Sequence, residues 1–136
     1  MLQPKRIKWR KPHKVDYTSS AKGNTYVAFG TAGIMAEEGC WITDRQIEAA
    51  RIAISKRLGK TGKMWIRIFP HMSLTKKPLE VRMGSGKGAP DKFVCPVKKG
   101  TIMFEVKGLS KEDAKRAFYL AGAKLPIKTK TVYLND

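Results

Sequence analysis

The chain has 136 residues, which suits a single domain, and its 42% hydrophobic and 9% aromatic residues exclude a disordered protein. The charge is unusual, because 28 lysines and arginines face 11 aspartates and glutamates, for a formal net charge of +17. Self-repulsion of this size opposes compaction, so we expect a polyanionic partner: nucleic acid first, then an anionic membrane surface or an acidic protein.

Residues 1–24 are predicted to form an irregular basic arm. Its first fourteen residues hold six basic side chains, no acidic one, and Trp9. Pro4 and Pro12 would interrupt an amphipathic helix, which argues against a transit peptide. Basic side chains can meet phosphates while an indole stacks on an exposed base, so the arm is a candidate RNA-binding segment; the alternative is a solvated tail. The basic residues are Lys5, Arg6, Lys8, Arg10, Lys11 and Lys14.

Residues 25–136 are predicted to form one α+β domain that begins with strands. "TYVAFG" and "AGIMAEEGCWI" are rich in β-formers and are punctuated by glycines. "KMWIRIF" has apolar residues on both faces, which predicts an interior strand with Arg67 as its odd member. "KFVCPV" and "TIMFEV" flank "KKG", which predicts a hairpin, and "IKTKTVYL" alternates like a last strand.

Two helices are predicted between these strands. The first covers residues 43–58, where Thr43 and Gln46 match a capping box and Gly59 suits the end. The second begins at Ser110. Two helices packed on a mostly antiparallel sheet, an α+β domain, is the natural architecture. Helical spacing predicts that the buried residues are Ile47, Ala50, Ile54 and Leu58 in the first helix and Ala114, Ala117, Phe118 and Ala121 in the second.

A long glycine-rich loop is predicted within residues 71–92. Its centre, "RMGSGKG" from Arg82 to Gly88, lacks the spacing of a P-loop, has no hydroxyl after Lys87 to hold magnesium, and is followed at once by Pro90 rather than a helix. Glycine backbone N–H groups can nevertheless approach a phosphate closely, with arginine and lysine adding charge. The loop therefore suits an RNA backbone, and a bare surface loop is the alternative.

The sequence offers little support for an enzyme. His13 and His71 have no convincing acid or base partner, and the adjacent Glu37 and Glu38 would point to opposite faces of a strand. The two cysteines and two histidines lack zinc-site spacing, so we expect no metal and no cofactor. No apolar run is long enough to span a bilayer, and the acids in the first helix argue against a membrane-surface protein.

Several motifs together resemble one family. "MLQPKRIKWRKPHK", "ITDRQIEAAR", "GKMWIRIFP", "KPLEVRMGSGKG" and "KLPIKT" occur in the order found in the bacterial large-subunit ribosomal protein numbered sixteen and its archaeal and eukaryotic relatives. The resemblance covers nearly the whole chain. It implies an α/β sandwich and a cytoplasmic, non-enzymatic ribosomal protein that binds 23S rRNA near the central protuberance and A site, supports late assembly, and touches neighbouring ribosomal proteins but no membrane or small-molecule substrate.

The resemblance also implies functional residues. The arm and three arginines of the motifs are expected on rRNA, and the glycine loop is expected to contact A- and P-site tRNA. This chain departs from the family pattern at Val15–Tyr17, at His71 and at Lys92–Phe93, but not in the glycine loop. The expected rRNA-binding residues are Lys5, Arg6, Lys8, Trp9, Arg10, Lys11, His13, Lys14, Arg45, Arg51 and Arg67; those facing tRNA are Arg82, Met83, Gly84, Ser85, Gly86, Lys87 and Gly88.

Overall fold

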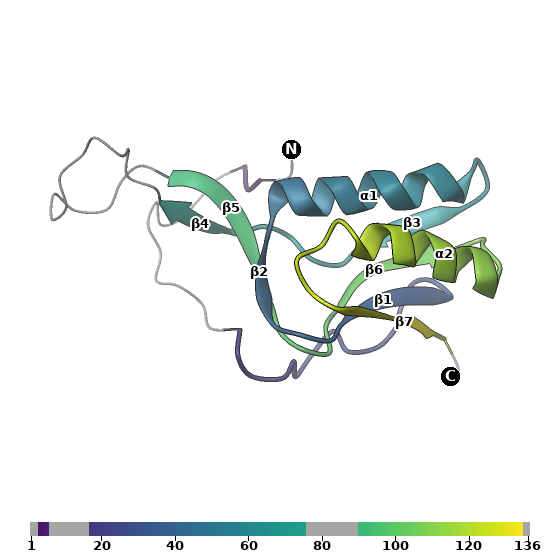
Figure 1. Cartoon of the computed structure of the whole chain (residues 1–136), viewed down its shortest axis with the longest axis horizontal. Helices are drawn as coiled ribbons and strands as arrows, with labels where there is room; N and C mark the ends of the chain where they lie inside the picture. The colour runs from purple at the N-terminus through teal and green to yellow at the C-terminus, as the bar shows by residue number, and fades with distance from the viewer. Residues whose placement is uncertain (1–2, 6–16, 76–89, 135–136) are drawn as a thin grey trace, which may run out of the picture.

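The computed structural model describes residues 3–5, 17–75 and 90–134. Two helices lie side by side over a sheet, and a second sheet continues from one end of the first (Figure 1). The predicted α+β architecture is therefore confirmed. The elements are β1 (Ala32–Ala36), β2 (Cys40–Thr43), α1 (Asp44–Leu58), β3 (Lys63–Ile66), β4 (Met72–Thr75), β5 (Pro90–Val97), β6 (Ile102–Lys107), α2 (Lys111–Gly122) and β7 (Thr129–Tyr133).

The strands form two antiparallel sheets. One has four strands in the order β3-β6-β1-β7, and the other has three in the order β2-β5-β4. β1 pairs with β6 in the first sheet, and β2, which follows β1 in the chain, pairs with β5 in the second. The segment that contains β1 and β2 and the segment that contains β5 and β6 therefore run together from one sheet to the other.

This topology corrects the predicted hairpin. β5 and β6 follow one another across the "KKG" turn, but they belong to different sheets. Gly100 has a φ of 96°, which glycine adopts without strain, and its N–H donates to the carbonyl of Ala36 at 2.8 Å. The turn is thus tied to the end of β1, and the chain changes sheet there instead of folding back on itself.

Two strand predictions are also wrong. Residues 25–30 form a loop rather than a strand, and three of its backbone N–H groups donate to the buried carboxylate of Glu105. β3 lies at the edge of its sheet rather than in the interior. Both of its faces are nevertheless covered, because Met64 packs against the core while Trp65 stacks with Phe29 of that loop. Apolar residues on both faces were therefore a sign of a covering loop, not of a second neighbouring strand.

The helices follow their local signals. At the start of α1 the Gln46 N–H donates to Thr43 Oγ1 at 3.2 Å, and the Thr43 N–H donates to Gln46 Oε1 at 2.9 Å, which confirms the capping box. Gly59 ends the helix with a φ of 66°. Ser110 caps α2 by accepting from the Asp113 N–H at 3.2 Å. The predicted buried stripes are confirmed, except that Leu58 is only partly buried.

The main core lies between the helices and the four-stranded sheet. Phe118 of α2 and Ile54 of α1 meet Ile34 and Phe104 of the central strands β1 and β6, all with at most 1% of their surface exposed. The last predicted strand is present as β7, paired with β1. No helix in the described part of the chain is both long enough and apolar enough to cross a membrane.

Thr43→Ala is expected to lower the free energy of unfolding by about 1 kcal/mol, because it removes the hydroxyl that accepts from the Gln46 N–H. Urea denaturation of the full chain measures the change. Thr43→Ser retains the hydroxyl and is expected to keep most of the stability. Equal stability of Thr43→Ala and the unsubstituted chain would contradict the capping argument.

Candidate nucleic-acid interface

Most of the predicted RNA-binding residues lie outside the described part of the chain. This holds for Arg6, Lys8, Trp9, Arg10, Lys11, His13 and Lys14 of the arm, and for the whole loop from Arg82 to Gly88. The structure does describe how the loop is attached. β4 and β5 run antiparallel, with Thr75 opposite Pro90, so the two ends of the loop are held side by side (Figure 1).

Four predicted residues are described, in four different settings. Lys5 is exposed, and so is Arg45 in the first turn of α1. Arg51 forms a bidentate ion pair with Glu48 one turn earlier, and the hydrogen bond lowers the pKa of that carboxyl from its usual value. Arg67 points into a polar network. The rRNA contacts expected for these four stay predictions, and the structure does not gather them into one cluster.

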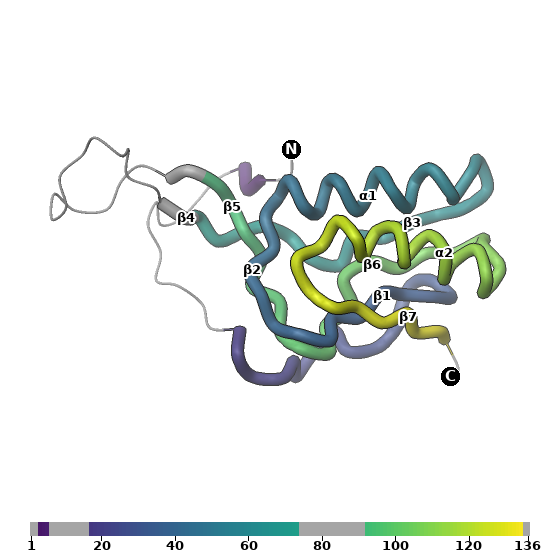
Figure 2. Tube along the Cα trace, viewed as in Figure 1, coloured from purple at the N-terminus to yellow at the C-terminus, as the bar shows by residue number. Residues whose placement is uncertain are grey.

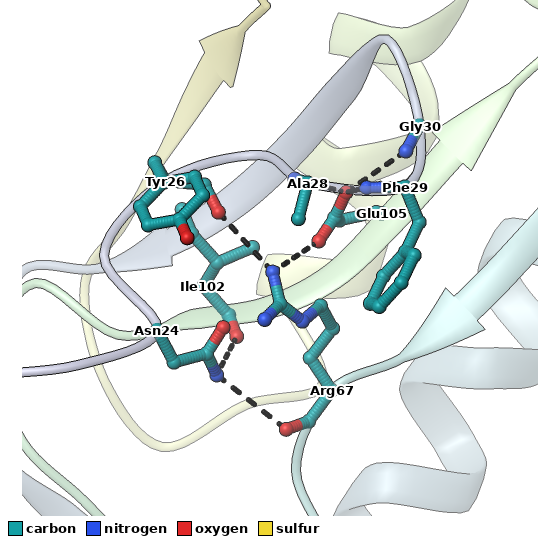
Figure 3. A network of polar contacts seen from close by, with 8 residues as sticks. All are labelled: Asn24, Tyr26, Ala28, Phe29, Gly30, Arg67, Ile102 and Glu105. Atoms are coloured by element: carbon teal, nitrogen blue, oxygen red, sulfur yellow. Dashed lines mark hydrogen bonds and ion pairs between the residues drawn. The ribbon is translucent and has the colours of Figure 1, made fainter.

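The network is built around the carboxylate of Glu105. This residue lies in the middle of β6, between Phe104 and Val106, and its side chain has no solvent exposure. Its Oε1 accepts from three successive backbone N–H groups, of Ala28 at 2.9 Å, Phe29 at 2.7 Å and Gly30 at 2.9 Å (Figure 3). Such a set of donors compensates for the water that the carboxylate has lost.

Arg67 completes the set of donors. Its Nη1 lies 2.6 Å from Glu105 Oε2 and also donates to the Tyr26 carbonyl at 3.1 Å. The guanidinium carbon lies 5.0 Å from the centre of the Phe29 ring, within reach of a cation–π contact. Figure 3 shows the guanidinium between the carboxylate and the Tyr26 carbonyl. Arg67 thus neutralises a buried charge, which accounts for an arginine between the apolar residues Ile66 and Ile68.

Opposing effects act on the protonation of Glu105. Burial alone raises the pKa of its carboxyl, because the charged form loses hydration. The N–H of Gly30, the guanidinium of Arg67 and the N–H groups of Phe29 and Ala28 stabilise the charged form and hold the pKa below its usual value. Glu105 is therefore ionised at neutral pH, and the loop is held by a full negative charge.

The same network presents aromatic rings to solvent. Phe29 stacks on Trp65 with ring centres 6.2 Å apart, yet 58% of its surface is exposed. Tyr26 in the same loop is 70% exposed. Gly30 allows this conformation, because a Cβ there would collide with the Val106 carbonyl. Exposed rings on a rigid loop can stack on unpaired bases.

Sequence reasoning missed this arrangement. The predicted site residues do not include Glu105, Tyr26 or Phe29, and the predicted strand at residues 25–30 is the loop that surrounds the carboxylate. A signal was present, because Glu105 and Arg67 are charges of opposite sign that each lie between apolar neighbours, in "MFEV" and "WIRIF". A buried charge is strongly destabilising unless an opposite charge pairs with it, so the presence of both residues indicates that Glu105 and Arg67 are in contact.

The described residues provide no group of three side chains suited to a metal ion. Cys40 and Cys95 are free thiols, and burial raises the pKa of the Cys95 thiol. Cys95 is therefore suited to packing rather than to nucleophilic chemistry.

Comparisons with known proteins extend over nearly the whole chain. Residues 4–132 match the family described as ribosomal protein L16p/L10e. Large ribosomal subunit protein uL16 of Ureaplasma urealyticum is 70% identical, over 97% of this chain and 96% of its own length. The protein of the same name from Malacoplasma penetrans is 67% identical, across 97% of this chain and 94% of its own length. That from Spiroplasma citri is 59% identical, across 97% of this chain and 96% of its own length.

Glu105→Gln is expected to lower the free energy of unfolding by about 3 kcal/mol at neutral pH, because Arg67 then lies beside a neutral group in a mostly buried site. Guanidinium chloride denaturation of the full chain measures the loss. Glu38→Gln, in an exposed turn, is the control and is expected to change little. Equal effects of the two substitutions would contradict the importance assigned to the network.

The pH dependence has a defined sign. A carboxyl whose pKa is lower in the folded state contributes stability that is complete above its unfolded pKa, near 4.5, and is lost as pH falls through the folded value. The unsubstituted chain is therefore expected to lose stability below about pH 4.5, and Glu105→Gln to lose less over that interval. Denaturation at a series of pH values tests this, and parallel profiles would contradict it.

Proposed function

The chain belongs to the ribosomal protein L16p/L10e family, and from this premise we propose that it binds 23S rRNA near the central protuberance and A site. It is a structural component of the large ribosomal subunit in the cytoplasm, not an enzyme. The proposal adds support of late assembly, contacts with neighbouring ribosomal proteins, and positioning of A- and P-site tRNA through the loop from Arg82 to Gly88.

The main support for rRNA binding is the net charge of +17 in a member of this family. Folding cannot neutralise most of the positive charge, because 28 basic residues face only 11 acidic ones; among the described residues, Arg51 and Arg67 form ion pairs with Glu48 and Glu105. The other described lysines and arginines are at least partly exposed. RNA phosphates would relieve their mutual repulsion.

The way in which the two ends of the glycine loop are held supports the proposed contact with tRNA. β4 and β5 bring its two ends together at the edge of the three-stranded sheet, away from α2 and β7 (Figure 2). A loop held at both ends presents its backbone in a restricted region at a lower entropic cost than a free tail does. Arg82 and Lys87 supply the charge for a phosphate, and the glycines supply close backbone approach.

The full chain is expected to bind large-subunit particles from which this protein has been removed with high salt. If binding neutralises 6–10 phosphates, the affinity will fall by roughly 10³–10⁵ between 50 and 200 mM salt. Sedimentation of labelled chain with the particles measures this. Binding that does not depend on salt, or absence of the chain from large subunits of its own organism, would contradict the rRNA assignment.

Arg82→Ala is expected to slow peptide-bond formation with A-site tRNA several-fold, while the free energy of unfolding stays within about 0.5 kcal/mol of the unsubstituted value. Reconstituted large subunits carrying the variant provide the rate, and urea denaturation provides the stability. Arg57→Ala, at the exposed end of α1, is the matched control. Unfolding of the Arg82 variant together with unchanged tRNA-dependent rates would refute the assignment.

A further inference from the structure

A groove runs between α2 and the edge strand β7, and none of its lining residues belongs to the Glu105 network. Its volume is about 730 Å³, and both elements contribute side chains to its walls. Gly122 lets the last turn of α2 approach β7, because a Cβ there would lie 2.7 Å from the Thr129 hydroxyl. Phe118 and Ile127, which also line the groove, belong to the core. The groove is therefore part of the packed domain rather than a space between mobile loops.

The α2 wall carries charge and an exposed ring. Lys115 and Tyr119 are four residues apart, so they project from the same side of the helix. Tyr119 has 72% of its surface exposed, the highest value among the large hydrophobic side chains of the described residues. One turn earlier the Lys111 ammonium lies 5.2 Å from the centre of the Tyr133 ring, and the Tyr133 hydroxyl donates to the Lys111 carbonyl at 3.3 Å. These contacts tie the start of α2 to the end of β7.

The β7 side adds an open backbone edge and, on the other face of the sheet, two further lysines. Thr129 lies against α2, and Lys128 and Lys130 alternate with it, so the two exposed lysines project from the opposite face, roughly 6.6–6.8 Å apart along the strand. β7 is the last strand of its sheet among the described residues. The Lys128 carbonyl accepts from the Glu37 N–H, and the Leu134 N–H donates to the Thr31 carbonyl, on the β1 side. In an antiparallel pair, every second residue directs its N–H and C=O groups to the partner strand, so those of Thr129 and Thr131 face away from β1.

Charge decides what the groove can bind. Three lysines line it, Lys115, Lys128 and Lys130, and Glu37 is the one acidic residue among its described lining residues. Lysines on β7 alone could serve to block pairing with a foreign strand. That role would not require Lys115 or an exposed Tyr119 on the facing helix. Cations on both sides of the β7 edge, outward N–H groups and an exposed ring together match a phosphate backbone with an unpaired base.

We propose that the groove between α2 and β7 binds the sugar–phosphate backbone of an unpaired rRNA segment along the β7 edge. Lys115 contacts phosphates from the groove side, Lys128 and Lys130 contact them from the other face of the edge, and Tyr119 stacks on a base. The proposal rests on the proposed rRNA binding and adds to it a surface formed by residues outside the N-terminal arm and the glycine loop. An acidic protein segment added to the β7 edge is the competing occupant.

The first test replaces the groove lysines together, as Lys115→Gln, Lys128→Gln and Lys130→Gln. Binding to large-subunit particles stripped of this chain is measured from about 50 to about 300 mM salt, a range over which screening of the charges increases through the physiological value. The plot of log affinity against log salt concentration is expected to become less steep by roughly 3, about 1 for each lysine that no longer meets a phosphate. All three side chains are exposed, and thermal unfolding verifies that the variant folds.

The matched control removes the same charge elsewhere, as Lys56→Gln, Arg57→Gln and Lys60→Gln. These residues are exposed at the end of α1 and just beyond it, and they do not line the groove. The control is expected to alter the salt dependence much less. Equal effects of the two triple variants would overturn the proposal, since general charge loss would then explain both. Failure of the unsubstituted chain to bind would overturn the proposed function itself, whereas normal binding with no effect of the groove variant overturns only this inference.

A second test identifies the occupant. Tyr119 is replaced by the photoreactive p-benzoylphenylalanine, the variant is incorporated into large subunits, and the subunits are irradiated. A crosslink from position 119 to rRNA is expected. A crosslink to a neighbouring ribosomal protein, or no crosslink in subunits that contain the variant, would overturn the assignment to rRNA.

Discussion

The carboxylate of Glu105 imposes the strongest single constraint on this fold. It lies in a central strand with no solvent exposure, so its charge has to be met by donors from other parts of the chain. Three N–H groups of residues 28–30 and the guanidinium of Arg67 meet it. The position of the loop before β1 and the path of the chain after β3 both follow from this requirement. The aromatic rings that the loop exposes are a consequence of the same contact.

A second constraint comes from the way the chain changes sheets. β1 and β6 pair in the four-stranded sheet, while the neighbouring segments β2 and β5 pair in the three-stranded one. The second sheet extends to one end of the molecule and carries the ends of the glycine loop on β4 and β5. β7 belongs to the first sheet, and both α2 and β7, which line the groove, lie toward the other end (Figure 2). A single small domain can therefore present basic surfaces to separate parts of a large RNA.

Local signals predicted the helices well and the sheets only in part. Thr43, Gln46 and Gly59 act within one turn of the residues that they cap, so sequence alone located α1. The "KKG" turn predicts a hairpin because the segments beside it are adjacent in sequence, whereas β5 pairs with the distant β2 and β6 with the distant β1. The candidate site was affected in the same way. The sequence singles out Arg67, but the residues that give it its role, Glu105 and Phe29, are 38 residues away in each direction.

The sequence by itself determined the class of fold, the two helices with their caps, the excess of positive charge, and the resemblance to one ribosomal family. All of these depend on composition, on short spacings, or on motifs read in order. Tertiary structure decided which strands pair, why a glutamate and an arginine occur among apolar residues, and that Lys115 and Lys130 lie on the two sides of one strand edge. The physical reason is distance along the chain, because a contact between remote residues exists only once the packing of helices on sheets has brought them together.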